Sequence, residues 1–329
     1  MTDLPIPVSA VDTLGHWFNR PECVLTTSGG DIFVSHWQGG VSHLMPTGEI
    51  RHYVAIGAGE GANPPIATNG FAITPESDFL LANLHPEGGG VWKLSVTGEA
   101  SPVLTEVDGM VLPPTNFVSI DRAGRIWATV STLHKPRAAA YRPDVADGFV
   151  VMMDKRGARI VADGLGYTNE AVVDPSGEWL YVNETMGRRT SRFRIRTDGS
   201  LGPRETVAEY PSGTWPDGIA FDEEGGVWMA SVISNRLIRV DRDGKQTTII
   251  EDADAEWVDT VERAFQAGTM TPEHLHDTGR ARLKDIASIA FGGPDRRTGY
   301  MGNLLEDRIY TFRSPYAGAE PPHWHWWNR

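Results

Sequence analysis

The sequence has few of the features that mark secreted, membrane-spanning or nucleic-acid-binding proteins. Its 329 residues include a single cysteine, Cys23, so no disulfide can form within the chain. No apolar run reaches the roughly 18 residues that a transmembrane helix needs. Lys and Arg (30) are fewer than Asp and Glu (43), and the net charge of −13 argues against nucleic acid or an anionic membrane as a partner.

The first residues also lack a targeting signal. The segment MTDLPIPVSAVD has no basic stretch followed by an apolar one, which a signal peptide requires. We therefore expect a cytoplasmic protein. Its acidic composition suits a soluble enzyme that acts on a small molecule, and both a monomer and a homo-oligomer are compatible with it.

Turn-forming residues, in contrast, are plentiful, with 36 Gly and 22 Pro. They help to separate six similar segments, each an apolar strand, a polar turn and a second strand rich in aromatic and β-branched residues. The segments are ECVLTTSGGDIFVSHW from Glu22, NGFAITPESDFLLANL from Asn69, NFVSIDRAGRIWATVS from Asn116, NEAVVDPSGEWLYVNE from Asn169, DGIAFDEEGGVWMASV from Asp217 and SIAFGGPDRRTGYMGN from Ser288.

The spacing of these segments predicts the fold. Their leading residues are 47, 47, 53, 48 and 71 positions apart, and the runs that follow give about four strands in most repeats. A period near 47 residues with four strands is typical of a β-propeller. We predict an all-β protein whose residues 1–329 form a single six-bladed β-propeller domain.

Two intervals exceed the period and indicate insertions. Residues 131–147 read as an extended loop between the second and third strands of the third blade. Within residues 254–284, the stretch AEWVDTVERAFQAG has apolar positions at helical spacing, which predicts a short helical insertion before the last blade. A second short helix is expected from Thr271.

The two ends of the chain are predicted to behave differently. The last blade has three strands of its own, so we expect AVDTLGHWF near the N-terminus to supply the fourth and close the ring. The C-terminal tail, residues 314–329, contains PPHWHWWNR and is expected to pack on the outer surface or on a partner chain.

The leading residues of the repeats all carry side-chain oxygens. Because innermost strands of a propeller run in the same direction, these residues are predicted to form one ring at one mouth of the central channel. Asn, Asp and Ser also favour turns, so a structural role is the alternative, although Glu22 does not suit it. Two carboxylates with several amide oxygens match the ligands that Ca²⁺ prefers, whereas a nitrogen or sulfur cage for zinc is not expected.

The quoted segments resemble the family of senescence marker protein (regucalcin), gluconolactonase and luciferin-regenerating enzyme. WPDGIAFDEEGGVWMASV looks like the Pro-Asp-Gly motif of that family, YTNEAVVDPSGEWLYVNET is similar to its Asn-Gly motif, and PECVL is similar to its first glutamate motif. The resemblance runs from about residue 11 to residue 312 and implies a six-bladed propeller with one divalent metal ion in the channel. Ca²⁺ is favoured over Zn²⁺, Mg²⁺ or Mn²⁺.

The same resemblance implies roles for individual residues. Glu22, Asn169 and Asp217 would be metal ligands, and Asn116 a further ligand or a substrate contact. Asp217 would also be the catalytic base or nucleophile. Glu170 stands where the family usually has glycine. Beyond the resemblance, the expected substrate contacts are Asn116, Asn69, Glu170 and, from the basic loop 131–147, His134, Arg137 and Arg142. These basic side chains could bind a substrate carboxylate or sugar hydroxyls, and the alternative is a solvated basic loop without a ligand.

These observations predict a metal-dependent hydrolase that opens a small lactone, sugar-derived or similar. The alternatives are a lyase, an isomerase or a phosphotriesterase on the same metal site, and a non-enzymatic propeller that binds calcium or another ligand.

Overall fold

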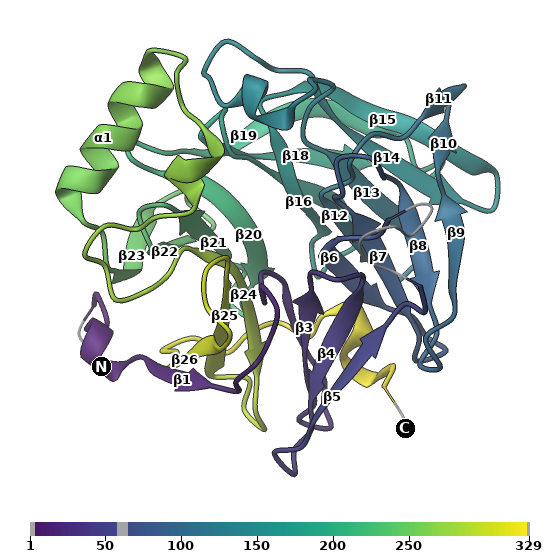
Figure 1. Cartoon of the computed structure of the whole chain (residues 1–329), viewed down its shortest axis with the longest axis horizontal. Coiled ribbons are helices and arrows are strands. Elements are labelled where there is room, and N and C mark those ends of the chain that lie inside the picture. Colours follow the sequence, from purple (N-terminus) through teal and green to yellow (C-terminus); the bar gives the residue numbers. More distant parts are fainter. Residues whose placement is uncertain (1–3, 58–64, 328–329) are drawn as a thin grey trace.

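The computed structural model describes residues 4–57 and 65–327, so the last two residues of the predicted tail lie outside the described residues. Six four-stranded antiparallel sheets surround a central axis, which confirms the six-bladed β-propeller (Figure 1). No helix in the described part of the chain is long and apolar enough to cross a membrane.

The first three blades follow the predicted repeats. Blade 1 contains β2 (Val24–Thr26), β3 (Ile32–His36), β4 (Gly40–Leu44) and β5 (Ile50–Val54); blade 2 contains β6 (Thr68–Ile73), β7 (Phe79–Asn83), β8 (Val91–Leu94) and β9 (Ala100–Leu104); blade 3 contains β12 (Phe117–Ile120), β13 (Ile126–Val130), β14 (Gly148–Asp154) and β15 (Gly157–Leu165). The small hairpin of β10 (Glu106–Val107) and β11 (Met110–Val111) lies between blades 2 and 3 in the sequence.

The other three blades are built in the same way. Blade 4 contains β16 (Thr168–Val173), β17 (Trp179–Glu184), β18 (Arg189–Ile195) and β19 (Leu201–Glu209); blade 5 contains β20 (Trp215–Phe221), β21 (Val227–Val232), β22 (Arg236–Val240) and β23 (Gln246–Glu251); blade 6 contains β24 (Ile286–Gly292), β25 (Thr298–Asn303), β26 (Ile309–Arg313) and, from the N-terminus, β1 (Asp12–Leu14). The helical elements are η1 (Val8–Ala10), η2 (Arg137–Ala140), α1 (Ala255–Gln266), η3 (Pro272–Leu275) and η4 (Pro322–His325).

An aspartate–tryptophan pair stabilises the turn after the innermost strand in two blades. In blade 3, the indole N–H of Trp127 donates to the Asp121 carboxylate at 2.9 Å. In blade 5, Trp228 donates to Asp222 at 2.7 Å, and Arg239 also pairs with that carboxylate. The aspartate thus accepts both local backbone and long-range side-chain hydrogen bonds, which fixes the turn against the second strand.

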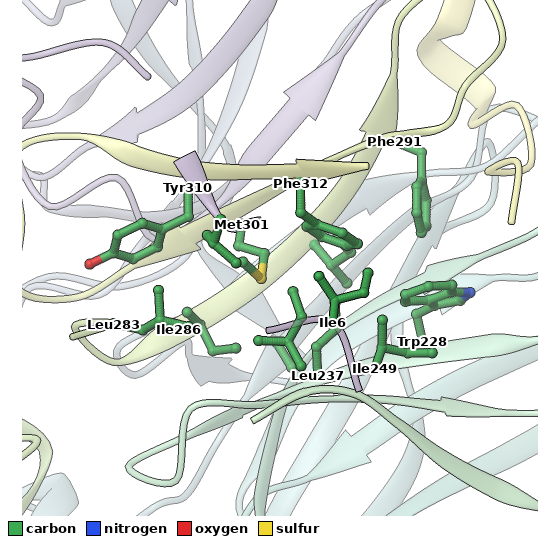
Figure 2. Packing of buried hydrophobic residues seen from close by; sticks show 14 residues of the cluster. Ile6, Trp228, Leu237, Ile249, Leu283, Ile286, Phe291, Met301, Tyr310 and Phe312 are labelled. Atoms are coloured by element: carbon green, nitrogen blue, oxygen red, sulfur yellow. The ribbon is translucent and has the colours of Figure 1, made fainter. Parts of the chain in front are cut away.

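The interior between neighbouring blades is apolar. Figure 2 shows the cluster between blades 5 and 6, where Trp228 and Phe291 meet edge to face with ring centroids 4.9 Å apart. Ile6 lies in the same cluster, and its backbone N–H donates to Ile249 at 2.7 Å. The N-terminal segment therefore covers the junction of these two blades before it enters blade 6.

The ends of the chain meet in blade 6, as predicted. β1 pairs antiparallel with β26, with Asp12 opposite Thr311 and Leu14 opposite Ile309. The two strands lie side by side although they come from opposite ends of the chain (Figure 1). This pairing completes the sixth sheet and leaves the ring without an open radial edge.

The helical insertion also forms where the sequence places it. α1 begins after Asp254, whose carboxylate caps the backbone N–H groups of Glu256 and Trp257. Val261 and Phe265 are buried against Trp215 and other residues at the upper ends of blades 4 and 5. "Upper" denotes the end of the channel at which the innermost strands begin, and "lower" denotes the opposite end.

The C-terminal tail was predicted to pack on the outer surface or on a partner chain. It runs instead across the lower mouth of the channel. Ala319 donates to the backbone of Phe221 in blade 5, Arg122 of blade 3 donates to the backbone of Glu320, and Ser28 of blade 1 donates to Trp324. Residues 319–323 close a cavity of about 400 Å³ that occupies the channel from Cys23 and Glu170 downward. Its walls are mainly apolar, and apolar surface on the tail explains why it binds there.

The burial of His323 makes the attachment of this tail depend on pH. Burial lowers the pKa of His323 to about 4, against an opposing contribution from the backbone of Thr26. This folded-state pKa lies below the unfolded value near 6.5, so the folded protein favours the neutral form of His323. The resulting stabilisation is fully present above about pH 6.5 and is lost as the pH falls toward 4. We expect up to about 3 kcal/mol of unfolding free energy to depend on His323 in that window.

Thermal unfolding at several pH values between 7.5 and 4.5 measures this effect. His323→Gln should flatten the loss of stability on acidification, whereas His16→Gln, at an exposed position, should leave it unchanged. Equal pH slopes for the wild-type protein and His323→Gln would show that the tail does not depend on a neutral histidine.

Candidate functional site

The leading residues of blades 1, 2, 3 and 6 are joined by hydrogen bonds at the upper mouth. The Asn69 amide donates to the Glu22 carboxylate at 2.8 Å and to the backbone oxygen of Asn116 at 3.1 Å. Ser288 donates to the backbone oxygen of Glu22 at 2.5 Å. Arg20, two residues before Glu22, places its guanidinium 2.8 Å from the other oxygen of that carboxylate. One face of the ring is therefore already tied together by protein contacts.

Asn169, the leading residue of blade 4, is held in one orientation. Its amide nitrogen donates to the hydroxyl of Thr185 at 3.1 Å, and Thr185 donates to the backbone oxygen of Pro216 at 2.8 Å. The amide oxygen of Asn169 is buried and has no hydrogen-bond partner among the described residues. The bond to Thr185 fixes which end of the amide is the oxygen, and this oxygen is available as a ligand because it accepts no hydrogen bond from the described residues.

Asp217 is set into the start of blade 5 by its backbone. The Asn183 side chain donates to the backbone oxygens of Asp217 and Gly218 at 3.0 and 3.1 Å. Gly218 lies so close to blade 6 that a Cβ atom there would be 2.6 Å from the backbone oxygen of Ala287. Only glycine fits this approach, which keeps Asp217 against the axis of the propeller.

The carboxylate of Asp217 lies in an environment that opposes its negative charge. Its side chain accepts no hydrogen bond from residues 4–57 and 65–327, and the residue is 5% exposed. Burial, followed by the charges of Glu22, Glu170 and Asp285, raises the pKa of Asp217 well above its usual range, against a smaller opposing effect of Arg20. Several carboxylates thus converge with too few positive charges to balance them.

The neighbouring carboxylates show the same shortage of positive charge. Burial raises the pKa of Glu170 to about 8, although its carboxylate accepts the backbone N–H of Ile219 at 2.8 Å. Burial likewise raises the pKa of Asp285 to about 8, although it accepts the backbone N–H of Ile233. A bound divalent cation would offset these unfavourable charges directly.

The donor set fits a hard cation better than a transition metal. Glu22, Asp217 and Asn169 offer carboxylate and amide oxygens, which suit Ca²⁺. In the part of the chain that the structure describes, no group of three or more His, Cys, Asp or Glu side chains is arranged for a metal ion. A site here therefore needs the amide oxygen of Asn169, and water or substrate to complete its coordination.

The predicted substrate residues occupy different places. Glu170 points downward from the ring and lines the lower cavity. In loop 131–147, His134 pairs with Asp147 at 2.9 Å and Arg142 pairs with Asp144 at 2.5 Å. The guanidinium of Arg137 instead lies over the ring of Tyr167, 5.4 Å from its centroid, beside the start of blade 4.

Sequence reasoning missed the residues that support this site. Asn183 and Glu184 lie at the end of β17, and both are fully buried. Asn183 holds Asp217, and Glu184 pairs with Arg189 at 2.6 Å. Thr185 carried no distinguishing signal. In the insertion, the ring of His274 stacks on that of Trp257 with centroids 5.9 Å apart.

This arrangement of ring, channel and motifs can be compared with known proteins. Residues 59–259 match the family described as SMP-30/Gluconolactonase/LRE-like region. The chain belongs to this family. Within the SMP-30/gluconolactonase family, it is 27% identical to a 6-deoxy-6-sulfogluconolactonase from Pseudomonas putida, over 72% of this chain and 69% of that protein.

Solved structures of the SMP-30/gluconolactonase type share the fold. A gluconolactonase from Xanthomonas campestris superposes with a TM-score of 0.67 at 18% identity, covering 93% of this chain and 89% of the other. A calcium-binding protein, regucalcin, from Agrobacterium tumefaciens gives a TM-score of 0.60 at 15% identity, covering 95% and 93%. At these identities the likeness establishes the propeller architecture alone.

Proposed function

We propose that this protein is a lactonase that opens a small, sugar-derived lactone at the upper mouth of the channel, with one divalent cation. The Asp217 carboxylate carries the proposal, because it is buried beside Glu22 without a hydrogen-bond donor. Membership of the SMP-30/gluconolactonase family and a sulfogluconolactonase relative support lactone chemistry. The calcium-binding regucalcin neighbour supports Ca²⁺ as the ion.

Glu22, Asn169 and Asp217 would hold the cation, with Asn116 as a further ligand. The bound cation would polarise the lactone carbonyl and stabilise the negative charge that develops on its oxygen. Asp217 is assigned to accept a proton from the attacking water, and the proton returns to the ring oxygen as the acyl–oxygen bond breaks. Asn183 serves this step by fixing the backbone of Asp217.

The substrate is proposed to bind between the ring and the loops above it. Asn116 presents an amide group that matches the hydroxyls of a sugar lactone. Asn69 is assigned to position the ring, because its amide already bonds to Glu22, Asn116 and Arg20. Glu170 lies below the ring, where its carboxylate accepts the backbone N–H of Ile219, and it is not assigned a substrate contact. His134, Arg137 and Arg142 lie on loop 131–147, which approaches the mouth from blade 3. We expect the enzyme to work in the cytoplasm on a small-molecule substrate. Neither nucleic acid nor a membrane is expected as a partner.

A metal assay combined with turnover tests the function. Purified protein is assayed for bound metal, then for hydrolysis of glucono-1,5-lactone before and after chelation, with Ca²⁺, Mg²⁺, Mn²⁺ and Zn²⁺ added back separately. We expect chelation to abolish turnover and one ion, Ca²⁺ first, to restore it. Unchanged turnover in metal-free protein, or no turnover with any ion, would refute the proposal.

Glu22→Gln should weaken cation binding. The substitution keeps the size of the side chain and its contact with Asn69, but removes one of two carboxylate charges from the site. We expect the Ca²⁺ dissociation constant from calorimetry to rise about 10- to 100-fold, in the range that loss of one charged interaction gives. Glu49→Gln, at an exposed position on blade 1, is the control, and equal dissociation constants for both variants would exclude Glu22 as a ligand.

A further inference from the structure

Arg137 is a cation near the site without an anionic partner. It lies in η2 of loop 131–147, and no carboxylate of the described residues pairs with it. Its Nη2 donates to the hydroxyl of Ser131 at 3.1 Å, while its Nε is buried and donates to no acceptor. The other two candidate residues of this loop, His134 and Arg142, are paired with Asp147 and Asp144. Arg137 is therefore the arginine of this loop that remains open to a ligand.

Tyr167 adds a second unsatisfied group beside Arg137. It precedes β16, two residues before Asn169, and its backbone has a positive φ of 65°. The side chain is 5% exposed, and its hydroxyl is buried without a hydrogen-bond partner of good geometry. Tyr141, from the same loop as Arg137, meets its ring edge to face at 5.3 Å. Thr185 links Tyr167 to the site, because its backbone N–H donates to the backbone oxygen of Tyr167 at 3.0 Å and its hydroxyl donates to that of Pro216, the residue before Asp217, at 2.8 Å.

A buried donor without an acceptor is unfavourable unless a ligand supplies the acceptor. Here two donors of different chemistry, a guanidinium and a phenol, lie together beside Asp217. A guanidinium binds an oxyanion through two parallel hydrogen bonds, and its charge favours an anion over a hydroxyl. The other charges that converge on the site are mainly carboxylates, so they offer nothing that an anionic substrate could bind.

We propose that Arg137 and Tyr167 form a subsite for an anionic substituent of the lactone, a carboxylate or a sulfonate. This rests on the proposed lactonase function and narrows its substrate class from sugar lactones in general to acidic ones. Arg137 and Tyr167 hold the substituent, while the lactone carbonyl lies toward Asp217. The two residues determine specificity and take no part in proton transfer.

A matched pair of substrates tests the subsite. Glucaro-1,4-lactone and glucono-1,4-lactone differ in that the first has a carboxylate where the second has a terminal CH₂OH. We expect the wild-type kcat/KM to favour the carboxylate by about 10-fold or more, the range of one charged hydrogen bond. Arg137→Gln should lower kcat/KM for the acidic lactone by about 10- to 100-fold and lower it clearly less for the neutral lactone, so that the preference for the carboxylate is lost. Arg137→Lys should retain part of the preference because it keeps the charge.

Two further measurements complete the test. Tyr167→Phe keeps the ring under Arg137 but loses the hydroxyl, and it should reduce the preference less than Arg137→Gln. Arg196→Gln removes an exposed arginine from blade 4 and should change nothing. Binding is followed independently of turnover by the rise in melting temperature with the product glucarate, which we expect for the wild-type protein and not for Arg137→Gln.

The outcomes separate the subsite from the reaction. If the wild-type protein hydrolyses neither lactone but glucarate stabilises it through Arg137, the lactonase function fails and the anion subsite stands. If both lactones are hydrolysed equally well, and glucarate stabilises wild-type protein and Arg137→Gln equally, the subsite is wrong and the lactonase function stands.

Discussion

Asp217→Asn is expected to lower kcat for lactone hydrolysis by about 10²- to 10⁴-fold, the contribution usual for a positioned general base. The substitution keeps the shape of the side chain and the hydrogen bonds from Asn183 to the backbone. It removes the group that accepts the proton and one charge from the proposed cation site. Steady-state kinetics with saturating metal, together with a calorimetric measurement of metal affinity, separates these two losses.

The same substitution should not destabilise the fold. Wild-type Asp217 is buried near the carboxylates of Glu22 and Glu170, which repel its charge. A neutral amide relieves this repulsion, so we expect the metal-free variant to melt at or above the temperature of the metal-free wild-type protein. Asp243→Asn, in an exposed turn of the same blade, is the control for both measurements. Full turnover by metal-stripped Asp217→Asn would disprove the role given to this residue.

Deleting residues 315–329 is expected to have the largest effect on stability. The tail buries Trp324 and Trp327, which are 6% and 8% exposed, and Trp327 packs against Phe33 and Phe79 in blades 1 and 2. Truncating one buried tryptophan typically costs about 3 to 5 kcal/mol, a large part of the roughly 5 to 15 kcal/mol of a whole domain. We expect the melting temperature to fall by about 10 °C or more.

Deletion should also open the channel from below. Residues 319–323 line the cavity in the intact chain, and without them its apolar walls face solvent. Increased fluorescence of a dye that binds apolar surface would report this change. If the deleted chain does not fold, Trp327→Ala tests the same contact, and Trp17→Ala, at an exposed position, is its control. A melting temperature within about 2 °C of wild type for Trp327→Ala would show that the tail adds little.

The propeller could be predicted from the sequence because its information is local and repeated. Each blade contains strands, turns and a leading residue within one period, so the number of blades and the places of the insertions follow from spacing. The pairing of β1 with β26 was also predictable, since the last blade was one strand short. The path of the tail was not, because it depends on contacts with the lower ends of five different blades.

The candidate site shows the same division between local and long-range information. The ring of leading residues follows from the repeats, and the structure places Glu22, Asn69 and Asn116 in hydrogen-bond contact. Their roles as ligands stay predictions. Asn183 acts across a blade boundary on the backbone of Asp217, and Arg20 reaches Glu22 from a residue with a positive φ of 51°. Such residues are found only when the register between neighbouring strands is known.

The pairing of β1 with β26 has a consequence for how the protein is made. Asp12 is synthesised early, but its partner Thr311 follows about 300 residues later, roughly 15 to 60 s at ordinary rates of translation. During that time the nascent chain has five complete blades at most, and the first strand has no sheet to join. The ring can therefore close only after β26 (Ile309–Arg313) has been synthesised. Completion of blade 6 thus joins a strand made at the beginning of synthesis to a sheet made near its end, so closure of the ring is a late event compared with the folding of blades 1 to 5.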